Sequence, residues 1–212
     1  MTHGTTCMHP PEKPGHRPAA YGRQLIEIHD RLRAELDRLM AAVDREFGGL
    51  PEGSATPDEP APGGEPTGRY APRRELRAYC LGFCAAVTRH HTGEDGGAFV
   101  ALAERFPGLR PVLAELAADH VLVADALTRV AGLLDDLPAA PDRATARRVR
   151  ADLAGLAALL ESHFSYEERK LTAALDALPA RDGPARRLFG LDPGPPAGTI
   201  PARGGTQSVT DS

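Results

Sequence analysis

Apolar side chains recur every third or fourth residue in four separate segments of the chain. This spacing places one apolar stripe along one face of an α-helix. The first stripe runs through Leu25, Ile28, Leu32, Leu36, Leu39 and Val43. The pattern therefore predicts amphipathic helices over residues 19–47, 73–94, 109–136 and 142–178, with a further short helical stretch over 97–106.

Proline and glycine gather between and outside these segments. We interpret residues 1–18 as a disordered arm, 48–72 as a flexible loop and 179–212 as a disordered tail. Prolines between the third and fourth segments leave only a short connection. The expected fold is all-α, an antiparallel up-down four-helix bundle over residues 19–178. The long loop at 48–72 also permits a crossover connection.

Each predicted helix carries a histidine within its apolar stripe, and two helices add a glutamate four residues later on the same face. With a rise of about 1.5 Å per residue, the four histidines fall in one layer, roughly 12–20 Å along the bundle. A single histidine on an apolar face is usually a hydrogen-bonded core residue. Four histidines with two glutamates are costly to bury unless a cation compensates them. These six candidate ligands are His29, His90, Glu94, His120, His163 and Glu167.

The donor types narrow the choice of metal. Imidazoles and carboxylates without thiolates suit iron, manganese or zinc. A structural zinc site needs only four ligands, whereas at least six groups converge here, which favours two ions. Glu94 and Glu167 are the natural bridges, because each carboxylate has two oxygens. Asp95, Asp119 and Glu168 either orient the imidazoles or belong to solvated helix faces.

The order His, HxxxE, His, HxxxE resembles that of the hemerythrin-like family, also described as HHE cation-binding domains. The resemblance covers roughly residues 20–178. It rests on His29, the run HHTGED at 90–95, Asp119-His120 and the run HFSYEE at 163–168. The HHTGED run is also similar to that of actinobacterial members.

The resemblance implies a non-haem di-iron site inside an antiparallel four-helix bundle, with the six residues above as ligands. Family members carry or store oxygen, sense oxygen or iron, respond to nitric oxide, or decompose peroxide. Ala124 stands where oxygen carriers of the family have a second histidine in the third helix, which favours reactivity over reversible carriage. His91 is the substitute ligand to test, the alternative being a histidine outside the ligand set. Tyr166 is either an inward donor or a packed or exposed tyrosine.

Charge and composition exclude some partners. The 212 residues include 25 basic and 29 acidic side chains, a mild balance that predicts no binding to nucleic acid or to an anionic membrane. No apolar run is long enough to span a bilayer, and the N-terminus lacks a signal-peptide pattern, so we expect a cytoplasmic protein. Three cysteines without framework spacing predict no disulfides. Cys80 and Cys84, one turn apart, are either core residues or a redox pair.

These observations leave several functions open. A module that binds or senses oxygen, nitric oxide, peroxide or iron is the first, with two iron ions as the cofactor and zinc or manganese as the alternatives. An enzyme that decomposes peroxide or reduces nitric oxide is the second. A metal that only stabilises the bundle is the third.

Overall fold

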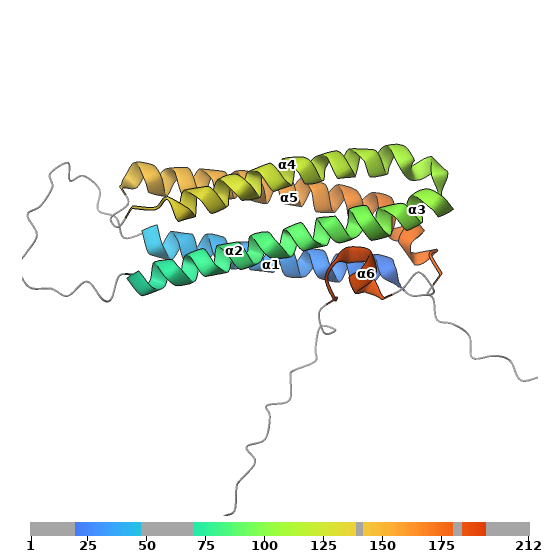
Figure 1. Cartoon of the computed structure of the whole chain (residues 1–212), viewed down its shortest axis with the longest axis horizontal. Helices are drawn as coiled ribbons and strands as arrows, with labels where there is room; N and C mark the ends of the chain where they lie inside the picture. The colour runs from blue at the N-terminus through green and yellow to red at the C-terminus, as the bar shows by residue number, and fades with distance from the viewer. Residues whose placement is uncertain (1–19, 48–69, 139–141, 180–183, 194–212) are drawn as a thin grey trace, which may run out of the picture.

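The computed structural model describes residues 20–47, 70–138, 142–179 and 184–193. The regular structure within these ranges is entirely helical. Figure 1 shows the four longest helices lying side by side. They are α1 (Tyr21–Phe47), α2 (Tyr70–Gly93), α4 (Arg110–Asp135) and α5 (Arg143–Asp176). The shorter elements are the π-helix η2 (Glu94–Ala98), α3 (Phe99–Arg105), the 3-10 turn η3 (Pro107–Leu109) and α6 (Ala185–Phe189).

Helix boundaries agree with the predicted ones to within a few residues. α2 begins at Tyr70, inside the predicted loop 48–72, because Pro72 lies in the first helical turn, where its missing N–H has no partner to lose. The predicted stretch 97–106 is α3. It continues from α2 through the π turn η2, so these three elements form one continuous helical segment.

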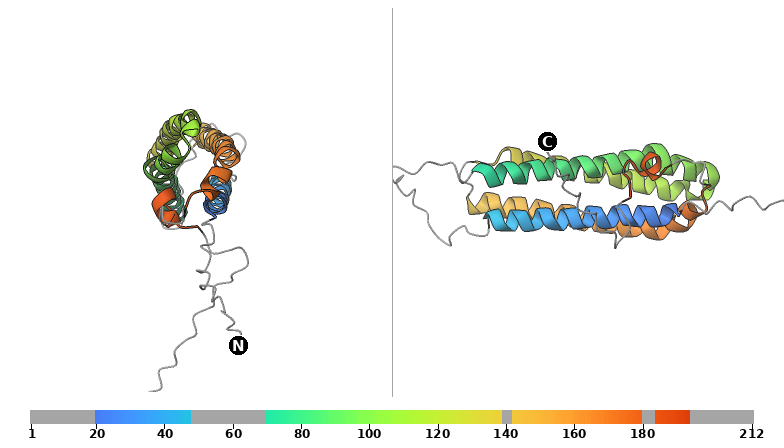
Figure 2. Two further views of the ribbon diagram at one scale, coloured as in Figure 1. Left: turned by 90° about the vertical axis from the view of Figure 1, so that its right-hand side faces the viewer. Right: turned by 90° about the horizontal axis from the view of Figure 1, so that it is seen from below.

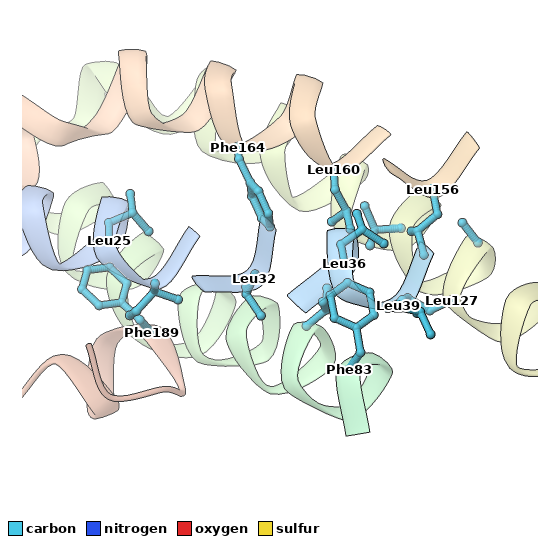
Figure 3. Close-up of a cluster of buried hydrophobic side chains, with 14 of the residues drawn as sticks. Leu25, Leu32, Leu36, Leu39, Phe83, Leu127, Leu156, Leu160, Phe164 and Phe189 are labelled. Carbon is cyan, nitrogen blue, oxygen red and sulfur yellow. The ribbon is translucent and has the colours of Figure 1, made fainter. Parts of the chain in front are cut away.

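The apolar stripes face a common core. α1 packs against α2 and α5, and α4 packs against the same two helices. The end-on view in Figure 2 shows the helices arranged around this shared interior. Figure 3 shows Phe164 of α5 and Leu32 of α1 projecting into it, and both side chains are at least 99% buried. The buried face of each helix is therefore the face that carries the candidate ligands.

The predicted tail 179–212 needs a correction, because α6 lies within it. Leu188 and Phe189 are buried, and Figure 3 shows Phe189 beside Leu25 of α1. Burying each such side chain stabilises the fold by roughly 1.5–3 kcal/mol, enough to hold a segment whose own helix is only five residues long. Five residues are too few to show a periodic stripe. The predicted arm 1–18, and residues 48–69, 180–183 and 194–212, lie outside the described residues.

In the part of the chain that the structure describes, no helix combines the length and the apolar character needed to cross a membrane.

Candidate metal centre

Two groups of buried donor side chains meet in the core. In each group, one donor atom per residue lies within 4.8 Å of every other. Glu94 belongs to both groups, so they form one continuous cluster. The first group is His29, His90, Glu94 and Glu167, and the second is His91, Glu94, His120 and His163.

The two glutamates lie between the imidazoles. Glu94 Oε1 is 3.2 Å from His90 Nε2, and its Oε2 is 3.6 Å from His120 Nε2. Glu167 Oε2 is 3.4 Å from His29 Nε2 and 3.7 Å from His163 Nε2. Each carboxyl group therefore touches an imidazole from both donor groups. These are the positions that bridging carboxylates would occupy.

A π turn lies next to the centre. Glu94 is the first residue of η2, directly after the end of α2 that carries His90 and His91. π turns inside α-helices are rare and occur frequently at functional sites. All three side chains are buried, so one continuous helical segment supplies candidate ligands to both donor groups.

Three of the five imidazoles donate from Nδ1 to acceptors outside the two groups. His29 Nδ1 donates to Glu168 Oε1 at 2.8 Å, and His120 Nδ1 donates to Asp95 Oδ1 at 2.9 Å. His90 Nδ1 donates to the backbone carbonyl oxygen of Phe189 at 3.1 Å. These acceptors fix the proton on Nδ1 and leave Nε2 free, which is the usual arrangement around a metal-bound histidine.

His163 has an acidic neighbour at Nδ1 but, within the described part of the chain, no hydrogen bond there. His163 Nδ1 lies 3.5 Å from Asp119 Oδ2. Among the acceptors, Glu168 is itself held by Arg33, whose guanidinium donates to Glu168 Oε1 at 2.8 Å and to Glu161 Oε2 at 2.7 Å. Phe164 stacks on the ring of His29, with the ring centroids 4.1 Å apart. Arg33 and Phe164 carry no signal in the sequence pattern beyond their place near the stripe.

The Nε2 atoms of four imidazoles face each other in two pairs. His29 Nε2 and His90 Nε2 are 2.9 Å apart, and His120 Nε2 and His163 Nε2 are 3.2 Å apart. Because His29 and His90 each carry their proton on Nδ1, neither Nε2 of that pair has a proton to donate. Two lone pairs at this distance repel each other unless a cation lies beside both.

Burial shifts the pKa values of the centre in the direction that removes charge. It lowers the pKa of His29 and His90 well below the usual value, and it lowers those of His120 and His163 to about 4. The imidazoles are therefore neutral at pH 7, as metal ligation requires.

Burial acts on the two glutamates in the opposite direction. It raises the pKa of Glu94 well above the usual value, with repulsion from Glu167 as the next cause. It raises the pKa of Glu167 to about 8. Without a cation, burial therefore favours the neutral form of both carboxyl groups, and Glu167 holds its proton at pH 7.

Several buried polar atoms of this cluster have no hydrogen-bond partner among the described residues. They are His91 Nε2, both carboxylate oxygens of Glu94, Glu167 Oε2 and His163 Nδ1. An unpartnered buried polar atom costs roughly 1–3 kcal/mol, so several in one place need a common explanation. Metal ions bound by the two groups would satisfy the atoms of His91, Glu94 and Glu167.

All seven residues singled out from the sequence are brought together, including His91. Its ring stacks on that of His120, with the centroids 4.0 Å apart and the planes 6° apart. Ala124 is exposed, so its position on α4 points away from the centre. The additional imidazole of the centre therefore comes from His91 on α2, and the position of Ala124 on α4 contributes no side chain to it.

Tyr166, Cys80 and Cys84 were also candidates in the sequence, and their side chains make contacts away from the donor groups. Tyr166 is half-buried, and its hydroxyl donates to Glu115 Oε2 at 2.7 Å, away from the cluster. Cys80 packs in the hydrophobic core, with its Sγ 3.9 Å from that of Cys84. Neither cysteine belongs to the two donor groups. The carbonyl of Phe189 contacts the centre, but it could not be expected from the sequence because any residue has a carbonyl.

A comparison with family models finds the hemerythrin HHE cation-binding domain, matched over residues 22–175. The match identifies the family and assigns the chain to no subgroup of it. Neither the curated proteins nor the solved structures include a significant match to this chain. The matched range contains all seven candidate ligands and ends before α6.

Proposed function

Because the chain belongs to the hemerythrin family of HHE cation-binding domains, we propose that it is a non-haem di-iron protein. In this proposal the centre binds or senses a small molecule, such as oxygen, nitric oxide or peroxide, or responds to iron itself. The proposed iron ligands are His29, His90, His91, Glu94, His120, His163 and Glu167.

The observation that carries the proposal is the sharing of Glu94 by two four-residue donor groups. One group alone would suit a single four-coordinate ion. Two groups joined by a carboxylate, with Glu167 beside imidazoles of both, suit two neighbouring ions bridged by carboxylates. When bound, such a pair supplies reversible one- and two-electron chemistry to a small molecule.

The spacing of the imidazole nitrogens favours an octahedral metal. Nitrogens at neighbouring corners of an octahedron with bonds of about 2.1 Å are about 3.0 Å apart, against about 3.4 Å for a tetrahedron. The His29–His90 distance of 2.9 Å matches the octahedral value, whereas the His120–His163 distance of 3.2 Å lies midway between the two values. Iron and manganese fit this arrangement better than a tetrahedral structural zinc.

The donor count leaves room for a further ligand. Five imidazoles and two carboxylates provide nine donor atoms, fewer than the roughly twelve positions around two octahedral ions. A groove between α4 and α5, lined by residues that include Glu115, Asp119 and Tyr166, brings solvent close to His163. We propose this groove as the approach for a small molecule.

The proposal also includes the topology of the fold. Contacts of α1 with α2 and α5, and of α4 with the same two helices, support an antiparallel up-down four-helix bundle over residues 19–178. For the protein as a whole we propose a cytoplasmic location, without nucleic-acid or membrane partners.

Metal analysis of the purified protein tests the proposal. We expect about two irons per chain and charge-transfer absorption that changes when oxygen or peroxide is added. His163→Ala should abolish the signal of the paired irons. One zinc per chain, or no metal, would contradict the proposal. Oxygen release on adding peroxide would instead favour the alternative, a di-iron enzyme that decomposes peroxide or reduces nitric oxide.

A further inference from the structure

We propose that α6 is a positioning element of the metal centre, in which the carbonyl of Phe189 holds His90 with its proton on Nδ1 and slows the loss of the ion bound beside it. The effect on the ion rests on the proposed di-iron function, whereas the effect on the imidazole does not. The family match ends at residue 175, so α6 and Phe189 lie outside the matched range.

The first support is the place of α6 in the fold. α6 contacts α2, η2 and α1, and Figures 1 and 2 show it lying across these helices near one end of the molecule. The side chain of Phe189 is completely buried, as is His90. Their hydrogen bond at 3.1 Å is therefore shielded from water, which cannot replace the carbonyl without α6 moving.

The second support is the close approach of the two backbones. A Cβ on Gly93, one turn after His90, would collide with the Phe189–Gly190 peptide. A Cβ on Gly97 would lie 2.5 Å from the carbonyl oxygen of Arg187. Because these two glycines have no side chain, the backbone of α6 can lie directly against the helix that carries the proposed ligands.

The third support is that the end of this segment is fixed. Gly190 terminates α6 with φ +66°, a left-handed conformation that glycine adopts without strain. Two residues later, the carbonyl oxygen of Asp192 accepts a hydrogen bond from Arg31 of α1 at 2.8 Å. The turn at Gly190 and the hydrogen bond from Arg31 therefore fix the backbone that follows the Phe189 carbonyl.

The two ends of the centre therefore differ in what covers them. His90 is anchored by a buried carbonyl. In contrast, His120 and His163 rest against Asp95 and Asp119, whose side chains are 45% and 39% exposed. We expect the ion held by His29, His90, Glu94 and Glu167 to leave more slowly than the other ion, because α6 covers that end.

Gly97→Ala tests the proposal, with Gly96→Ala as its matched control. Both changes lie in the same π turn, but a Cβ on Gly96 meets nothing within 4 Å, whereas one on Gly97 must displace α6. Iron release to a coloured ferrous chelator is followed over time in the loaded full-length protein. We expect Gly97→Ala to speed the slow phase about 10- to 100-fold, the usual effect of losing a contact to a ligand imidazole. Gly96→Ala should leave it unchanged.

A second measurement needs no metal. The ¹⁵N shifts of the His90 ring in the metal-free protein report which nitrogen carries the proton. The native protein should show the Nδ1–H form, and Gly97→Ala a mixture of both forms. Gly190→Ala, whose Cβ would collide with the carbonyl oxygen of Arg89, should give the same mixture of ring forms. This variant replaces Gly97→Ala in the test if Gly97→Ala fails to fold.

The outcomes separate the two proposals. A native protein without iron, but with His90 in the Nδ1–H form that the variants lose, contradicts the di-iron function and keeps the positioning role. If the native protein binds two irons and both variants match Gly96→Ala in release rate and tautomer, α6 only stabilises the fold and the positioning role is wrong. If the variants melt at a lower temperature but match Gly96→Ala in release rate and tautomer, the positioning role is likewise wrong.

Discussion

His29 and His90 face each other with 2.9 Å between their Nε2 atoms, although each has already donated its Nδ1 proton elsewhere. Two neutral rings cannot hydrogen-bond in this arrangement. The fold therefore forces two lone pairs together in its interior, and a cation is the simple way to make that favourable. The predictions below depend on this preorganised cluster.

Glu94→Gln should lower the iron content from about two per chain to one or fewer, because the shared carboxylate loses both its charge and one donor oxygen. The metal-free variant should melt at the same temperature as the native protein or higher, since the pKa of Glu94 is already raised and an amide carries no charge to bury. Elemental analysis and calorimetry measure the two effects. Glu104→Gln, exposed on α3, serves as the control. An unchanged iron content would remove Glu94 from the ligand set.

His91→Ala should cost one iron and keep the other. His91 belongs only to the group with Glu94, His120 and His163, so its loss leaves that ion with too few donors and spares the His29 side. Iron content of about one per chain is the expected result. His29→Ala should remove the opposite ion. Retention of two irons by His91→Ala would show that its ring only packs on His120.

Iron binding should release protons, and its affinity should rise as pH increases toward 8. Burial raises the pKa of Glu167 to about 8, so below that pH an incoming ion displaces a proton from this carboxyl group. Calorimetric titrations in two buffers with different ionisation heats measure the number of protons released. Equal binding heats in the two buffers at pH 6.5 would contradict the expectation.

The same pKa shift gives Glu167 a contribution to the stability of the metal-free fold that disappears at high pH. The raised folded pKa of Glu167 means that its contribution is complete below about pH 4.5 and is lost as pH rises through about 8. The loss is on the order of a few kcal/mol. Urea unfolding of the metal-free native protein and of Glu167→Gln, each at pH 6 and pH 9, isolates this loss, because the buried histidines change stability in the opposite direction but do so equally in both proteins.

Glu168→Leu should weaken iron binding about 10- to 100-fold, because His29 loses the acceptor of its Nδ1 proton. Glu168→Gln keeps an acceptor oxygen at this position and should recover most of the affinity. Competition with a chromogenic chelator gives both values. A Gln variant as weak as the Leu variant would mean that the charge at Glu168, held by Arg33, matters more than the hydrogen bond.

Helical periodicity explains why most of the centre could be predicted. His29 and His163 lie on the apolar stripes, so helix geometry alone turns them inward. The role of His91 could not be decided, because the position beside a stripe turns inward or outward with small changes in helix rotation, and the π turn η2 follows it. The sequence could not reveal α6 either, because its contact with His90 is made by a backbone carbonyl.

The two donor groups differ in composition as well as in cover. One has two imidazoles and two glutamates, and the other has three imidazoles and the shared Glu94. Anionic carboxylates stabilise the higher oxidation state of iron more than neutral imidazoles do. Because the proposed bridges would give both ions the same two carboxylates, the difference would rest on the additional neutral imidazole at the end nearer the solvent, which would favour the ferrous state there. An electron for an incoming molecule would then be available at the end that the molecule reaches first.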